Sequence, residues 1–107
     1  MNMPRSNATV ALRRENRISM EIPVILEGHR HLPGAESTFT ENVSVNGARV
    51  VSMRRWDKGA QILIASRSGD FRSEARVAYC QPLHGDGYAI GVQFLDPQGR
   101  WVVQSAS

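Results

Sequence analysis

Apolar and polar residues alternate with a period of two along much of this 107-residue chain. The alternation is clear over residues 18–26 (ISMEIPVIL), 37–44, 71–81 and 88–94. A period of two places successive side chains on opposite faces of a β-strand, so that one face packs in a core while the other meets solvent. Each of these four stretches is therefore predicted to form a strand.

Two shorter stretches and the residues between the strands complete the predicted fold. Residues 48–52 and 61–66 (QILIAS) are apolar enough for buried strands, and Gly- and Asp-rich turns separate the strands from one another. Asn46-Gly47 is a strong tight-turn signal, because both residues accept a positive φ. Six short strands with no long helical pattern predict an all-β fold. Closure into a six-stranded antiparallel β-barrel is favoured, because it removes the bare edges of an open sheet.

The alternation also predicts which side chains share a face of their strand. Ser37, Phe39 and Val43 have the same parity in the second stretch, and Val77 and Tyr79 have the same parity further along the chain. Each of these sets is expected to lie on a single side of its strand.

The length suits one domain with a modest hydrophobic core. Residues 1–11 show no period and are expected to be a flexible N-terminal tail, and residues 12–107 are expected to form a single barrel domain. The end of the chain, RWVVQSAS (100–107), fits either a last strand or a short C-terminal helix. Trp101 is expected to cover the open end of the barrel, and Trp56 to pack on its rim.

Nothing in the sequence indicates export or insertion into a membrane. No apolar run approaches the roughly 20 residues that span a bilayer, and the N-terminus lacks the apolar core of a signal peptide. The lone cysteine, Cys80, has no partner for an internal disulfide. These features favour a cytoplasmic protein without a transmembrane segment.

The excess positive charge is concentrated near the N-terminus. The chain has a formal net charge of +3, and residues 1–20 alone hold four arginines against a single acid, Glu15. Lys58 is the one lysine among 13 basic residues, and arginine presents a planar fork that suits phosphate and stacks on purines. The segment therefore favours an anionic partner, although a basic tail that aids solubility would show the same composition.

No arrangement of residues supports catalysis. His29 and His31 form an H-x-H pair, but a zinc site needs three or four ligands and no acid or thiol has convincing spacing nearby. Cys80 has no histidine at a motif distance and is interpreted as a small apolar filler. Neither of the common glycine-rich phosphate loops is present. The protein is therefore not expected to be an enzyme, nor to hold a metal or cofactor.

Two short motifs remain as candidates for binding. Arg13 and Arg17 form R-x-x-x-R immediately before the first predicted strand, where two guanidinium groups can reach one anion. Asn42, Ser44 and Gly47 form N-x-S-x-x-G at the end of the second strand, where short polar groups can bond the edge of a base. Each motif alone is weak, because the first arises by chance and the second also suits a strand end and its turn.

The order and spacing of the two motifs resemble the PilZ family of cyclic di-GMP receptors. Three further segments resemble the family: residues 42–50 (NVSVNGARV), the start of the strand after Lys58, and residues 88–94 (YAIGVQF). The resemblance covers residues 12–95 in all. The resemblance implies a six-stranded antiparallel barrel on which an arginine segment, residues 12–17, folds over the ligand. The ligand-binding residues that it implies are Arg13, Arg14, Arg17, Asn42, Ser44 and Gly47.

The family pattern assigns these residues different contacts. Arg13 and Arg17 would contact phosphates and a guanine, with Arg14 as an auxiliary contact, while the three residues of the second motif would bind from the barrel surface. Asn42 departs from the aspartate that many members carry, which is expected to weaken guanine binding modestly. Leu12 adds no further cation before the arginines, and this favours one bound ligand molecule rather than two.

The resemblance implies a cyclic di-GMP-binding receptor or adaptor in bacterial second-messenger signalling, with a protein effector as its partner. The alternative is a degenerate PilZ module that acts only through protein–protein contacts. A third hypothesis, a barrel that binds single-stranded nucleic acid, is disfavoured, because such barrels need a stripe of exposed aromatic residues. No DNA or RNA partner is therefore expected.

Overall fold

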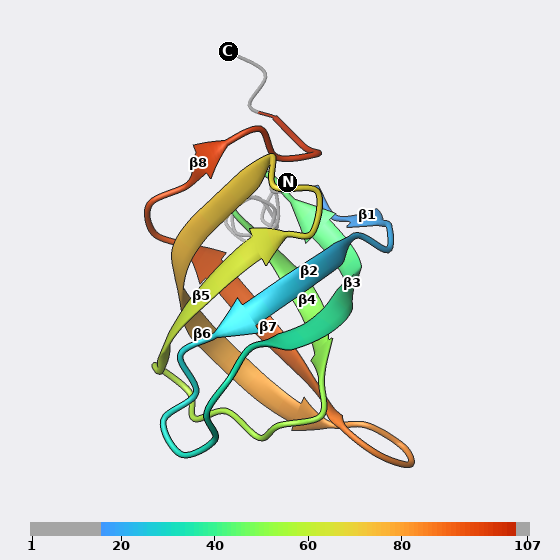
Figure 1. Cartoon of the computed structure of the whole chain (residues 1–107). Coiled ribbons are helices and arrows are strands. Elements are labelled where there is room, and N and C mark those ends of the chain that lie inside the picture. The colour runs from blue at the N-terminus through green and yellow to red at the C-terminus, as the bar shows by residue number, and fades with distance from the viewer. Residues whose placement is uncertain (1–15, 105–107) are drawn as a thin grey trace, which may run out of the picture.

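The computed structural model describes residues 16–104, and every regular element in this part of the chain is a strand (Figure 1). Residues 16–104 contain no helix, and hence none long and apolar enough to cross a membrane. The strands are β1 (Ile18–Ser19), β2 (Pro23–Glu27), β3 (Glu36–Ser44), β4 (Gly47–Ser52), β5 (Gln61–Ser66), β6 (Phe71–Pro82), β7 (Tyr88–Phe94) and β8 (Gln98–Gly99).

Six of these strands close into a barrel. They follow the order β3-β2-β5-β6-β7-β4, and β4 pairs again with β3, so no long strand keeps an open edge. All the pairings are antiparallel, as the sequence predicts. The two-residue strands β1 and β8 add to β3 and β6, and Figure 1 shows both at the same end of the barrel. Residues 100–104 form neither a strand nor a helix, and residues 105–107 lie outside the described part.

The first predicted strand is interrupted. Residues 18–26 divide into β1 and β2, and Pro23 becomes the first residue of β2, where its missing N–H is tolerated. Between the two strands, the buried side chain of Thr40 bonds to the backbone. Its hydroxyl accepts a hydrogen bond from the Ile22 amide at 2.8 Å and donates one to the Met20 carbonyl at 2.7 Å. Ile18, at the start of β1, is exposed rather than packed in the core.

β3 and β6 each contain a β-bulge, after which the side chains point to the opposite face of the strand. The prediction that residues of the same parity share one face is therefore wrong in these two strands. In β3 the register shifts between Thr40 and Asn42, so Phe39 is exposed although Val43, of the same parity, is fully buried. In β6 the shift lies between Val77 and Tyr79, so these two side chains lie on opposite faces. A bulge inserts one residue into a strand, and every side chain beyond it changes face.

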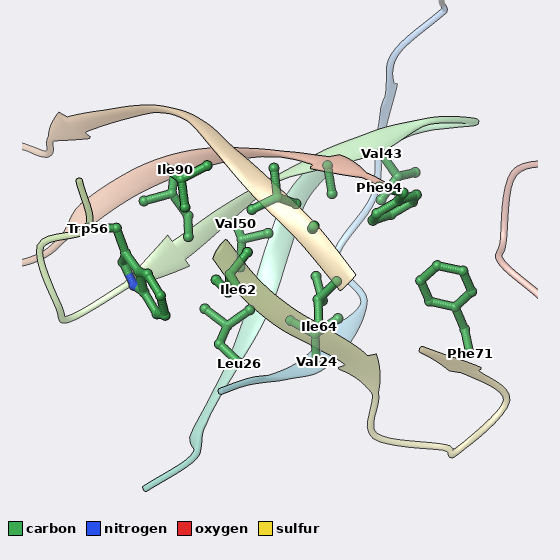
Figure 2. Close-up of a cluster of buried hydrophobic side chains, with 14 of the residues drawn as sticks. Val24, Leu26, Val43, Val50, Trp56, Ile62, Ile64, Phe71, Ile90 and Phe94 are labelled. Carbon is green, nitrogen blue, oxygen red and sulfur yellow. The ribbon is translucent and has the colours of Figure 1, made fainter. Parts of the chain in front are cut away.

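The core fills the barrel from end to end, with a tryptophan near each end. Trp56 lies at one end beside Leu26, and Phe71 and Phe94 lie at the other end (Figure 2). Trp101 packs on Phe71 and Phe94, with ring centroids 4.6 and 5.1 Å away, and it is only 6% exposed. Both tryptophans therefore pack as expected, and Trp101 covers the end of the core at Phe71, the residue of β6 that pairs with β8.

Candidate functional site

The second binding motif lies where β3 turns into β4. Val43 points into the core, so its neighbours Asn42 and Ser44 belong to the opposite, outer face of β3. The turn consists of Val45 and Asn46, after which Gly47 pairs directly with Ser44. The bulge between Thr40 and Asn42 turns Asn42 and Ser44 to the outer face. In a regular strand, both would lie on the same face as the buried Thr40.

Arg17 brings the first motif into contact with the second. Its guanidinium donates a hydrogen bond from Nη1 to the Asn42 side-chain oxygen at 2.9 Å, across 25 residues of sequence. The pairing of β1 with β3 explains this contact, because Ser19 lies opposite Asn42 and Arg17 follows on the same path. Arg13 and Arg14 lie outside the described residues.

Ser44 is fully buried, and both its side chain and its backbone make hydrogen bonds. The hydroxyl donates to the Gly47 carbonyl at 3.3 Å, and the Ser44 carbonyl accepts from the Trp101 indole at 2.8 Å. In this conformation Ser44 therefore stabilises the turn and links it to the C-terminal segment that covers the barrel end.

Gly47 is required for a reason that the local sequence does not show. The predicted tight turn is present and contains Asn46, but Gly47 is the first residue of β4 and is not among the glycines with positive φ, so the turn does not depend on a left-handed backbone at Gly47. A Cβ at this position would lie 2.3 Å from the backbone oxygen of Val92 in β7. Gly47 is therefore needed because β4 and β7 approach each other too closely for any side chain.

Arg49, the next outward-facing residue of β4, is the centre of a polar cluster that the motifs do not include. Its Nε donates to Glu41 at 2.7 Å, and its Nη1 donates to the Tyr79 hydroxyl and to the Gln81 side-chain oxygen at 3.1 Å each. These bonds, that to Glu41 first and that to Tyr79 next, raise the pKa of Arg49 above its ordinary value. Sequence parity places Arg49 on the same face as Gly47, but its partners come from β3 and β6 and are not evident from the sequence.

The two histidines of the H-x-H pair lie at the other end of the barrel, beside a cavity of about 590 Å³. His29 Nε2 bonds the Arg55 carbonyl at 2.8 Å, while its Nδ1 accepts from the amides of His31 and Leu32. The His29 ring therefore links the loop between β2 and β3 to the loop between β4 and β5 by hydrogen bonds. Over residues 16–104, no three His, Cys, Asp or Glu side chains gather where they could hold a metal.

Comparison with protein-family models shows a match over most of the chain. The sequence model of the PilZ domain matches residues 11–101, a span that includes Arg13, Arg14 and Arg17, all six barrel strands and Trp101. No curated protein matches the chain.

Proposed function

The chain belongs to the PilZ domain family, a known family of cyclic di-GMP-binding domains, and from this membership we propose that it is a cyclic di-GMP receptor in bacterial second-messenger signalling. Domains of this family bind ligands and act as adaptors rather than as catalysts. The proposed receptor is a single domain over residues 12–107 that works in the cytoplasm and passes the signal to a protein effector.

The proposed ligand contacts join the two motifs. Arg17, with Arg13 and Arg14 from the segment before it, would bind the phosphates and stack on a guanine, because a guanidinium matches both groups. Asn42 would accept from a guanine N–H. Ser44 and Gly47 are buried in this structure, so their proposed contact with the base requires the turn between β3 and β4 to become accessible on binding. The charge of the ligand agrees with the concentration of cations in residues 1–20.

The hydrogen bond from Arg17 to Asn42 is the observation that carries this proposal. It joins two motifs 25 residues apart at a distance of 2.9 Å, so a single small ligand can contact both. Both side chains are accessible, and exchange of this exposed bond for contacts with a ligand costs little. Ligand binding is proposed to fold the arginine segment, residues 12–17, onto the barrel, and the new surface is proposed to contact the effector.

Isothermal titration calorimetry with cyclic di-GMP tests the proposal on three proteins. The wild type is expected to bind, and Arg17→Ala is expected to weaken binding by about tenfold or more, because it removes a charge-assisted contact. Arg72→Ala serves as the matched control, since Arg72 is exposed at the opposite end of β6 from Tyr79 and its loss changes the net charge equally.

Two results would contradict the proposal in different ways. Wild-type protein that releases no heat at high micromolar concentration would exclude a receptor and leave a module that acts only through protein contacts. Equal affinities of wild type and Arg17→Ala would retain the ligand but place its site elsewhere.

A further inference from the structure

The outer face continues beyond Asn42 as a row of residues across four strands. Asn42 in β3 lies opposite Arg49 in β4, Arg49 lies opposite Gly91 in β7, and Gly91 lies opposite Tyr79 in β6. We name Asn42, Arg49, Gly91 and Tyr79 the outer row. Neighbouring strands lie about 4.8 Å apart, so the row extends for roughly 14 Å from Asn42 to Tyr79.

The Tyr79 ring lies over the glycine in the middle of this face. Gly91 has no side chain, and a Cβ there would lie 2.2 Å from the Tyr79 ring, so the ring occupies the space directly outside β7. Beside the outer row, Ser44, Gly47 and Gln93 lie opposite one another in the same way. Arg49 is thus the one charged side chain of the outer row, and it stands between two glycine positions.

The Arg49 guanidinium is already fixed in place. Glu41, Tyr79 and Gln81 receive its Nε and Nη1 hydrogens, and its ring contact with Tyr79 places Cζ 5.7 Å from the ring centroid. Among residues 16–104, no acceptor bonds its Nη2, and 27% of the side chain remains exposed. A cation held in one orientation binds an anion without the entropic cost of ordering a long side chain.

We propose that Arg49 is a further ligand contact, and that the nucleotide lies along the outer row with one acceptor oxygen on Arg49 Nη2. The inference rests on the proposed function. A cyclic dinucleotide carries two phosphates and two purines, whereas Arg17 and Asn42 occupy only one end of the row. The acceptor oxygen belongs either to a phosphate or to the O6 edge of a guanine, since both bind arginine.

Three variants test this contact by calorimetry against the Arg72→Ala control. Arg49→Ala is expected to weaken cyclic di-GMP binding by about tenfold or more. Tyr79→Phe keeps the charge but removes one bond that orients the guanidinium, so a smaller loss of about twofold to fivefold is expected. Arg49→Lys distinguishes the two acceptors, because a phosphate accepts lysine well whereas a guanine edge matches the planar fork of arginine.

A measurement on the wild type keeps the test valid if Arg49→Ala unfolds the barrel. In a ¹H–¹⁵N spectrum, cyclic di-GMP is expected to shift the backbone amides of Gly91 and Tyr79, which lie beyond Arg49 in the outer row, while that of Gly85 in the distant β6–β7 turn stays unchanged. Shifts confined to Arg17, Asn42 and their direct neighbours, with Gly91 and Tyr79 unchanged, would overturn the inference.

The inference and the proposed function fail in distinguishable ways. Suppose that the wild type binds, that Arg17→Ala loses affinity, and that a folded Arg49→Ala binds as well as Arg72→Ala. Arg49 then only stabilises the fold and does not contact the ligand, and the proposed function stands. If the wild type does not bind cyclic di-GMP, both are wrong.

Discussion

Asn42 holds a central place in the site as an uncharged acceptor. Its side-chain oxygen accepts from Arg17, and its backbone pairs with that of Arg49, whose guanidinium bonds the neighbouring Glu41. A carboxylate at this position would accept more strongly from a guanine N–H pair, while its exposed ion pair with Arg17 in the free protein would contribute less than about 1 kcal/mol.

Asn42→Asp is therefore expected to tighten cyclic di-GMP binding by about threefold to tenfold. Calorimetry measures the change, and Gln61→Glu is the matched control, because it makes the same amide-to-acid exchange at an exposed position in β5. Unchanged or weaker binding by Asn42→Asp would mean that position 42 does not accept from the base.

Gly47 permits a second prediction about a single residue. Gly47→Ala is expected to lower the free energy of unfolding by about 2–3 kcal/mol or more, because the new Cβ meets the Val92 oxygen and two strands must separate. Gly69→Ala is the comparison. Gly69 has a φ of +88° and open space around it, so only left-handed strain of about 1 kcal/mol is expected there. Denaturant unfolding gives both values, and equal losses would contradict the packing requirement.

The two bulges decide how the strands present their side chains. Alternation predicted four of the barrel strands and short apolar runs between turns predicted the other two, because apolar residues and turn residues are local signals. It did not reveal the shifts near Asn42 and before Tyr79, since a bulge depends on how a strand pairs with its neighbour. Because of these shifts, Phe39 lies on the opposite face from Val43, and Tyr79 on the opposite face from Val77. For the same reason, the sequence does not indicate Tyr79 as a partner of Arg49.

A pair of substitutions in β3 tests the bulge. Phe39→Ser is expected to change the free energy of unfolding by less than about 0.5 kcal/mol, because Phe39 is 42% exposed. Val43→Ala is expected to cost about 2 kcal/mol, because it leaves a cavity in the core. Alternation without a bulge predicts similar losses for both, so a large loss for Phe39→Ser would place Phe39 inside and contradict the observed register.

Closure of the barrel brings the distant parts of the site together. The family resemblance implied that Arg17 and Asn42 contact the same ligand, and the structure shows the hydrogen bond between them. The partners of Arg49, however, are separated from it by 8, 30 and 32 residues. Those contacts exist only once β4 pairs with β3 and β7, and β7 pairs with β6. A site of this kind depends on the whole fold, and its geometry cannot be obtained from motif spacing.

The two tryptophans allow a test of whether the barrel unfolds as one unit. Trp56 and Trp101 are both buried, at opposite ends of the core, and Trp101 also bonds the Ser44 carbonyl beside the proposed ligand site. In Trp101→Phe the fluorescence reports the end that holds Trp56, and in Trp56→Phe it reports the end beside the site. Within each variant, fluorescence and far-ultraviolet circular dichroism are expected to give the same denaturation midpoint, because one closed sheet leaves neither end an independent core.

Cyclic di-GMP is then expected to raise the midpoint reported from both ends, since a ligand that binds only the native state stabilises the whole cooperative unit. The end that holds Trp56 is the more informative of the two, because it lies across the core from Trp101 and from the Ser44 carbonyl that Trp101 bonds. If the ligand raised the midpoint only in the Trp56→Phe protein, in which Trp101 reports, the two ends of the barrel would unfold separately. Binding would then stabilise a local structure around Ser44 and Trp101 rather than the closed barrel.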